Sequence, residues 1–206
     1  MKYVESCTYL GIKLDYKLNM IHYINKVKSQ VLNKIYMLSK ARKYLTLGAS
    51  ITVFKSMLLP YFEYGHIFLE ICPERLIEKV DRLFLRAIRI ALKDYSNIDN
   101  KIILNKMKIL PLKMRREISI CKLMFNKIQK GEVNILEPAA NTRIHDGRVV
   151  PWPDVSNDRF LKFIPHLGAT VWNKLPSELR NIGDKCIFKS KIKLHYEKLF
   201  NPEKNN

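Results

Sequence analysis

The chain has 206 residues, of which 47% are hydrophobic, so it can bury the core of one or two domains and is not an intrinsically disordered tail. It carries 37 Lys and Arg residues against 19 Asp and Glu, a formal net charge of +18, which predicts a polyanionic partner, nucleic acid first of all. The sequence has neither an apolar run of membrane-spanning length nor a secretory leader, so we expect an intracellular protein of the cytoplasm or nucleus with no membrane partner.

The apolar period changes from two to 3.6 near the start of the chain. Apolar and other residues alternate over Tyr9–Leu14, which predicts a half-buried strand, and 15–19 is expected to form a turn. A long helix follows, because apolar residues recur within one stripe: Ile21, Ile24, Val27, Val31, Ile35 and Leu38. Lys26 and Lys40 lie away from that stripe, so we count both among the cations that would contact nucleic acid.

Two further helices are predicted in the first half of the chain. The first runs over 49–59 and should end or kink at Pro60, because proline cannot continue the helical hydrogen bonding. The aromatic segment 61–65 is expected to pack against neighbouring helices. The second begins at Pro73, a residue suited to a first helical turn, and reaches about Lys93.

The helix predicted over 73–93 gathers cations on one face. They are spaced 4, 3, 4, 3 and 4 residues apart: Arg75, Lys79, Arg82, Arg86, Arg89 and Lys93. At roughly 100° per residue this spacing keeps them in one stripe about 27 Å long, enough to follow several phosphates of a duplex. Apolar residues are expected on the opposite face: Leu76, Val80, Leu83, Ala87 and Ala91.

A basic run on a helix is often no more than a solvated surface, and this alternative stays open for the stripe. Glu78 can pair with Arg82 four residues later, whereas the other members of the stripe have few acidic neighbours on their own face. That imbalance favours an external anion.

A shorter helix is expected over 100–107 and a longer one over 113–130. The first turns of the longer helix carry Lys113, Arg115 and Arg116, where the positive end of the helix dipole disfavours cations. A bound phosphate would relieve that conflict, and the alternative is a merely solvated first turn.

The chain changes character at Gly131, and the prolines of 138–165 predict an extended connection. Three side chains are expected to anchor it to the bundle: His145, Trp152 and Phe160. A short helix closing before Pro176 and a last helix over 184–200 should follow.

The expected fold is therefore mainly α, a helical bundle with a short N-terminal strand or hairpin and an irregular C-terminal extension. We divide it into a strand segment over 1–19, a basic helical bundle over 20–130, and a connection with C-terminal helices over 131–206. Residues 1–130 carry 25 Lys and Arg against 10 Asp and Glu, and residues 131–206 carry 12 against 9. The polyanion site is accordingly expected in the first part.

The sequence shows no catalytic or metal-binding pattern. Two-metal phosphoryl transfer needs clustered carboxylates, yet the chain has no Asp-Asp pair, and a lone Asp15 is more often a turn or helix-start residue. The five histidines lie outside nucleophile and zinc motifs, and the four cysteines form no close pair, which predicts free, mostly buried thiols. We therefore expect no cofactor in this chain.

Five short motifs follow one another along the chain: Tyr9-Leu10-Gly11-Ile12, Pro60-Tyr61-Phe62-Glu63-Tyr64-Gly65, Arg86-Ala87-Ile88-Arg89-Ile90, Leu110-Pro111-Leu112 with Arg115-Arg116, and Trp172-Asn173-Lys174-Leu175-Pro176. In this order and spacing they resemble the C-terminal region of non-long-terminal-repeat retrotransposon reverse transcriptases of the jockey-like and CR1-like type. The resemblance covers almost the whole chain. Phe68 stands where such proteins usually place a tryptophan, another bulky aromatic residue.

The resemblance implies the closing strands of a polymerase palm, followed by a helical thumb and the region beyond it. In these polymerases the thumb holds the template-primer duplex by its backbone, so the implied partner is an RNA or DNA duplex. An upstream palm and fingers would be partners if the chain belongs to a longer polyprotein. Only eight residues precede Tyr9, so the catalytic carboxylates are expected before residue 1, and Mg²⁺ is expected only for the complete polymerase.

Two hypotheses of different class follow. The first is a catalytically incomplete fragment of an RNA-directed DNA polymerase, without activity alone, that binds nucleic-acid backbone through its basic helices. The second is a structural or interaction remnant whose charges are only solvated. A role of an amphipathic helix at a membrane surface is a third, weaker reading.

Overall fold

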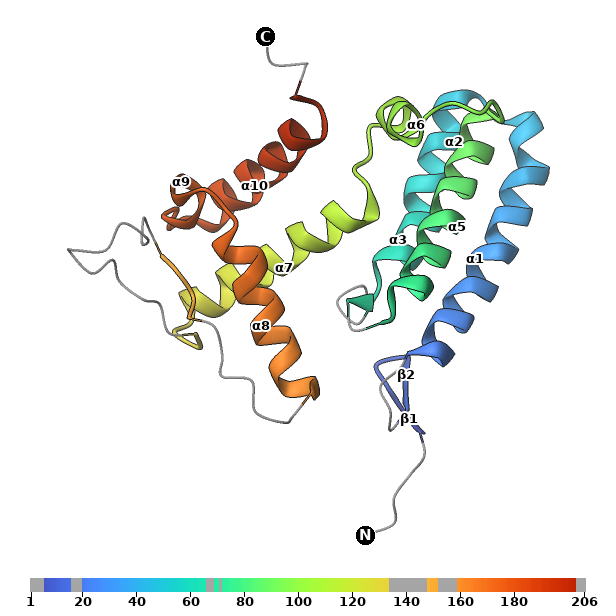
Figure 1. Ribbon diagram of the computed structural model, residues 1–206. Coiled ribbons are helices and arrows are strands. Elements are labelled where there is room, and N and C mark those ends of the chain that lie inside the picture. Colours follow the sequence, from blue (N-terminus) through green and yellow to red (C-terminus); the bar gives the residue numbers. More distant parts are fainter. Residues whose placement is uncertain are drawn as a thin grey trace. The chain divides into compact units, whose positions relative to one another are not determined.

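The computed structural model describes residues 6–15, 20–65, 69–70, 72–133, 148–151 and 159–202, without the side chains of 13–15 and 159–165. The chain divides into two compact units, Met1–Leu112 and Lys113–Asn206. Its secondary structure is mainly helical with a short N-terminal hairpin, which confirms the predicted fold class (Figure 1).

The division between the units differs from the expected boundary at residue 130. It falls at the start of a helix, so residues 113–130 group with the C-terminal helices rather than with the basic bundle. Counted by unit, residues 1–112 carry 19 Lys and Arg against 9 Asp and Glu, and residues 113–206 carry 18 against 10. Net charge therefore does not single out the first unit as the polyanion site.

The N-terminal hairpin consists of β1 (Ser6–Tyr9) and β2 (Ile12–Asp15), which pair antiparallel. Between them Leu10 and Gly11 have φ angles of 47° and 78°. Positive φ at both central residues is the requirement of a type I′ turn, whose twist matches that of a two-stranded ribbon. The single strand predicted over Tyr9–Leu14 is therefore wrong, because its alternating pattern spans a turn.

Helix α1 (Ile21–Ala41) confirms the predicted long helix. Its buried residues are Tyr23, Ile24, Val27, Val31, Ile35 and Leu38. Ile21, which was expected in the same stripe, is exposed at the first helical position. The turn predicted before it lies largely outside the described residues, which resume at Met20.

A proline passes through the next helical run without ending it. The run consists of α2 (Leu47–Val53), a π-helical turn η2 (Phe54–Leu58) and α3 (Leu59–Glu63). The backbone N–H of Leu59 donates to the carbonyl of Phe54, five residues back. This widened turn lies directly before Pro60, whose ring would clash with the preceding turn of a regular α-helix. Of the two outcomes expected at Pro60, an end or a kink of the helix, the end at residue 59 is therefore wrong, and the local change is a widened turn.

The first unit is built around aromatic side chains from different helices. Figure 1 shows α1, the α2–α3 run and α5 (Glu74–Leu92) side by side. The ring of Phe84 on α5 lies 5.9 Å from that of Phe54 and 5.2 Å from that of Phe62, centroid to centroid. These tilted and edge-on contacts fix α5 against the α2–α3 run.

Gly65 ends the α2–α3 run at a close contact with the rest of the unit. Its φ is 65°, and a Cβ added there would lie 2.7 Å from the hydroxyl of Tyr23 and 2.9 Å from Cδ1 of Ile12. The Tyr23 hydroxyl also donates a hydrogen bond to the carbonyl of Tyr64. A left-handed backbone and the absence of space both require glycine here.

Helix α6 (Asn100–Met107) completes the first unit and confirms the short helix predicted there. The second unit holds α7 (Leu112–Gln129), whose first residue is the last of the first unit, with α8 (Arg159–Asn173), α9 (Ser177–Arg180) and α10 (Lys185–Phe200). Helices α7 and α10 match the helices predicted over 113–130 and 184–200.

Helix α8 corrects the extended connection predicted through Pro165. It begins at Arg159 and runs across that proline, so only the part before it could be extended. One proline removes a single backbone hydrogen bond, and the burial of Ala169 and Trp172 on the following turns offsets that loss. The side chains expected as anchors, at 145, 152 and 160, lie outside the described residues.

The second unit has an aromatic core of its own. Phe125 stacks on Phe188 with centroids 4.4 Å apart, and Trp172 lies 5.6 Å from Phe188. Asn173 joins an extended segment to α8, because it accepts from the N–H of Val150 at 3.0 Å and donates to its carbonyl at 2.9 Å. The Trp-Asn pair of the last motif therefore has a structural role.

Candidate nucleic-acid interface

The α5 helix displays part of the predicted basic stripe at the surface. Arg75, Lys79, Arg82 and Arg86 are all exposed. They span twelve residues of helix, and the eleven steps from Arg75 to Arg86 measure about 17 Å at 1.5 Å per residue. The opposite side of α5 is held in the core by these residues: Val80, Phe84, Ala87, Ile88, Ile90 and Ala91. Burial of that side fixes the direction in which the cations point.

A groove of about 380 Å³ runs between α5 and α1 beside these cations. Its apolar lining consists of Ile24, Val27, Leu76, Val80 and Leu83, and its polar lining of Asn25, Lys28, Lys79, Arg82 and Arg86. Leu76 and Leu83 were expected on the buried side of α5, but both are only half-buried and line the groove. The cations therefore stand over an apolar floor rather than on a flat polar surface.

The acidic neighbours of this face balance little of its charge. Within the described residues, an ion pair on this face joins Arg82 to Glu78 at 3.9 Å, with both side chains exposed. Such an exposed i,i+4 pair contributes at most a few tenths of a kcal/mol, about 0.3–0.5, so it does not hold Arg82 away from a stronger anion.

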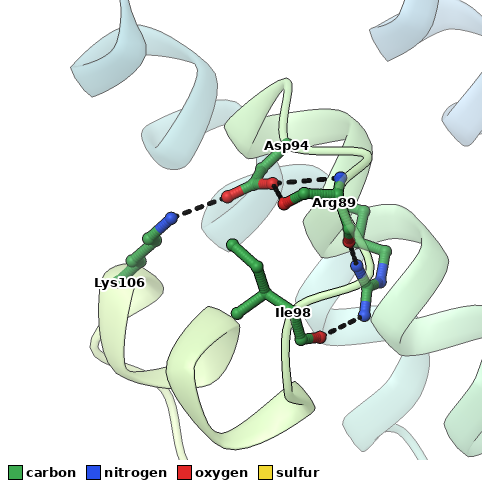
Figure 2. Close-up of polar contacts among 5 residues, drawn as sticks. Arg89, Asp94, Ile98 and Lys106 are labelled. Atoms are coloured by element: carbon green, nitrogen blue, oxygen red, sulfur yellow. Dashed lines mark hydrogen bonds and ion pairs between the residues drawn. The ribbon is translucent and has the colours of Figure 1, made fainter.

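Arg89, predicted as a member of the stripe, is bound to the protein itself. Its guanidinium donates to the carbonyl of Ile98 at 3.0 Å (Figure 2). It also donates to the carbonyl of Ser96 at 2.6 Å and to the side chain of Asn100 at 3.2 Å. Arg89 thereby fixes the connection between α5 and α6. Lys93 remains exposed, as the left-handed C-cap of α5.

The same connection contains an ion pair between Asp94 and Lys106, whose atoms lie 2.7 Å apart (Figure 2). The hydrogen bonds from Lys106 and from the hydroxyl of Ser96 lower the pKa of Asp94 to about 2. This carboxylate is therefore ionised throughout the physiological range and is occupied by the protein. Asp94 lies just after the C-terminal end of α5, and its ion pair is with Lys106 rather than with the exposed arginines of that helix.

The cluster predicted at the start of α7 is only partly at the surface. Lys113 is exposed, Arg115 is half-buried, and the side chain of Arg116 is only 4% exposed. A guanidinium enclosed to that degree cannot reach a phosphate at the surface. Arg116 is therefore a part of the interior of the structure, and Lys113 alone stays freely accessible.

The two predicted cations of α1 lie in different surroundings. Lys26 donates to the carbonyl of Gly11 at 2.9 Å and lines a second cavity, of about 440 Å³, with Tyr61 and Tyr64. Lys40 lies over the ring of Tyr36, with 5.4 Å between its Nζ and the ring centroid. Neither residue lines the groove beside α5.

Lys28 was missed in the sequence, although it is the cation that α1 contributes to the groove. It follows Val27, a buried member of the apolar stripe, and its position beside that stripe was the available signal. Placing it next to α5 required knowledge of which helix packs against α1. Such pairing is not encoded in the periodicity of a single helix.

The cysteines and the possible metal ligands are the remaining candidates for a site. None of the four cysteines forms a disulfide. Cys72 and Cys121 are buried and the other two are exposed, so two of the four thiols follow the expectation of burial. Burial raises the pKa of Cys72 to about 11 and that of Cys121 to about 12, which keeps both thiols protonated. No group of three His, Cys, Asp or Glu residues within the described ranges is arranged to hold a metal ion.

No helix in the described part of the chain is long and apolar enough to cross a membrane. Comparison with known proteins identified no family: neither a family model, nor a curated protein, nor a solved structure matches this chain.

Proposed function

We propose that this protein binds the phosphate backbone of a nucleic-acid duplex, without sequence preference, through the exposed cations of α5. The observation that carries the proposal is that Arg75, Lys79, Arg82 and Arg86 are exposed on one face of a helix whose other face is buried. Lys28 of α1 adds a further cation across the groove. Backbone binding needs cations in a row at phosphate spacing, with no particular hydrogen-bond pattern toward the bases.

The resemblance to retrotransposon reverse transcriptases suggests what the duplex would be. We propose a catalytically incomplete polymerase fragment that contributes a thumb-like duplex-holding region, with template and primer as the natural ligand. The chain itself has no Asp-Asp pair, so the metal-binding carboxylates of such an enzyme would come from elsewhere.

The test is a fluorescence-anisotropy titration of a labelled blunt duplex at roughly 50 and 200 mM salt, the range over which several phosphate contacts change affinity strongly. We expect binding that weakens steeply with salt and is indifferent to sequence. The variant Arg82→Glu with Arg86→Glu should lower both affinity and the salt slope, while circular dichroism shows unchanged helicity.

Two results would refute the proposal. One is no measurable binding of the duplex at low salt. The other is binding whose affinity does not change with salt, because phosphate contacts release counterions in proportion to their number. Either result would favour the alternative of a structural or interaction module.

A further inference from the structure

The end of α1 displays two tyrosines that the proposed duplex interface does not use. Tyr36 is 63% exposed and Tyr44 is 79% exposed. Each ring lies beneath a lysine: Lys40 Nζ is 5.4 Å from the centroid of Tyr36, and Lys43 Nζ is 4.6 Å from that of Tyr44. Single exposed aromatic residues are ordinary, but two aromatic rings within nine positions, each with its own cation, form a surface of mixed aromatic and basic character.

The connection that carries Tyr44 is fixed by hydrogen bonds. It is the 3-10 turn η1 (Arg42–Tyr44), and its Arg42 donates to the carbonyl of Ala91 at 2.8 Å and to that of Leu45 at 3.0 Å. The buried hydroxyl of Ser50 donates to the same carbonyl of Ala91 at 2.8 Å. The tyrosine is thus presented from an anchored turn, so little conformational entropy is lost when a ligand contacts it.

These bonds also place the turn that carries Tyr44 beside the C-terminal end of α5, and Tyr36 lies in the last two turns of α1, which lead directly into that turn. Ala91 lies in the last turn of α5, two residues before the exposed Lys93. The turn that carries Tyr44 is therefore joined to the C-terminal end of the same helix that displays the arginines. A nucleic acid lying along α5 in this direction would reach the two tyrosines next.

We infer that Tyr36 and Tyr44 stack on unpaired bases of a single strand that continues from the duplex on α5, while Lys40 and Lys43 contact its phosphates. Aromatic faces and cations together are the usual means of binding single strands without sequence preference, since every base has a flat face and every nucleotide a phosphate. On binding, each lysine would give up its contact with the tyrosine ring and contact a phosphate of the strand instead. The inference rests on the proposed function, because the duplex on α5 brings the strand to this end.

The experiment compares a blunt duplex with the same duplex carrying a single-stranded extension of about six nucleotides, a length within the usual range of such sites. For the wild-type chain we expect the extension to raise affinity roughly tenfold, as one well-stacked base would. Tyr36→Ala with Tyr44→Ala should abolish that gain and leave the affinity for the blunt duplex unchanged. Tyr36→Phe with Tyr44→Phe should retain it, because stacking needs the ring and not the hydroxyl.

Tyr95→Ala is the matched control, since Tyr95 is 70% exposed on the connection between α5 and α6. It should keep the gain. The inference is overturned if the extension gives no gain, or if the gain survives in the double alanine variant. It is also overturned if the two tyrosines instead mediate binding to phosphatidylserine-containing vesicles while the extension adds nothing.

Failure of the proposed function would be distinguishable from failure of this inference. If the blunt duplex does not bind at all, the duplex proposal fails. The stacking site is then tested by titrating a single-stranded oligonucleotide, without any duplex, against the wild type and the double alanine variant. Binding that depends on the two tyrosines would support the stacking site. Its absence would overturn it.

Discussion

Helices α5 and α10 carry the same number of cationic residues, five each, but arrange them differently. α10 is the more positive helix by count, with one acidic residue against three in α5. Its buried residues Phe188, Ile192 and Tyr196 form one line. At 100° per residue, Lys189 and Lys193 fall on one side of that line, whereas the other lysines of its later turns fall on the opposite side: Lys191 and Lys198.

The difference shows that spacing, rather than the number of charges, makes a basic face. Intervals of three and four residues keep cations together in α5, whereas an interval of two residues, as between Lys189 and Lys191, moves the next side chain by roughly 200°. In α10 each flank is left with about two lysines. The backbone of a duplex can contact only one flank of a helix at a time, so fewer lysines of α10 can contact phosphates together.

The largest expected effect comes from reversing charges on the two helices in parallel. Arg82→Glu with Arg86→Glu, and Lys191→Glu with Lys198→Glu, each lower the net charge by four. We expect the α5 pair to weaken duplex binding roughly 100-fold at low salt and to reduce the salt slope by about two, one for each phosphate contact. The α10 pair should cost less than about threefold by the same reasoning, because it acts only through net charge.

Anisotropy titrations at a series of salt concentrations measure both pairs, with helicity by circular dichroism as the control for folding. Equal losses for the two pairs would contradict the comparison. They would mean that the total charge of the chain attracts the duplex and that no particular face does.

A second prediction divides α5 itself into binding and structural cations. Arg89→Met removes three hydrogen bonds to the α5–α6 connection and should lower the free energy of unfolding by about 1–2 kcal/mol. Arg86→Met, at an exposed position, should change it by less than about 0.5 kcal/mol. Duplex affinity should fall in Arg86→Met.

Urea unfolding and duplex titration of both variants decide this prediction. Arg89→Met should bind like the wild type wherever it is folded. If it retains full stability and loses affinity, Arg89 contacts the ligand, and the hydrogen bonds of the free protein are exchanged on binding.

The sequence predicted the helices well because their apolar stripes are local. The apolar periodicity of α1 lies within one helix, so no knowledge of neighbours was needed. That the helix continues through Pro60 and Pro165 could not be predicted, for the opposite reason. A π turn before Pro60 lets the first helix continue, and buried residues on the turns after Pro165 let the second continue. Neither feature can be predicted from the position of the proline alone.

The candidate site was predictable to the extent that one helix defines it. The four exposed cations of α5 followed from spacing alone. Arg89 and Arg116 could not be separated from them, because the first is bound by a connection seven to eleven residues away and the second is buried. Lys28 lies on another helix, and only the packing of α1 against α5 brings it to the groove.

A smaller effect is expected from the starts of the two helices. The N-cap residue of α10 is Asp184, whose carboxylate accepts from the N–H of Ile187 at 2.7 Å, whereas the N-cap residue of α5 is Pro73, which makes no side-chain cap. Asp184→Ala should therefore lower the free energy of unfolding by about 1 kcal/mol, the usual value of such a cap. Pro73→Ala removes no cap and should have a smaller effect in urea unfolding. Equal effects would show that the cap contributes little.

The smallest expected effect concerns the end of α5 and depends on pH. The hydrogen bonds from Lys106 and Ser96 hold the pKa of Asp94 at about 2, below its unfolded value of roughly 3.9. A carboxylate with a lowered pKa stabilises the folded state above the unfolded value, and this contribution is lost as the pH falls through the folded value. Asp94→Asn should therefore lower the thermal midpoint at pH 6, and its difference from the wild type should shrink between about pH 4 and pH 2.

Glu197→Gln supplies the matched control on α10. Glu197 pairs with Lys193 four residues earlier at 3.7 Å, and both side chains are exposed, so removing the charge should change stability by only about 0.3–0.5 kcal/mol. A larger shift for Asp94→Asn than for Glu197→Gln would show that the pair closing α5 is held more firmly than a surface pair. A constant difference between Asp94→Asn and the wild type down to pH 2 would contradict the prediction, because it would mean that ionisation of Asp94 does not stabilise the connection.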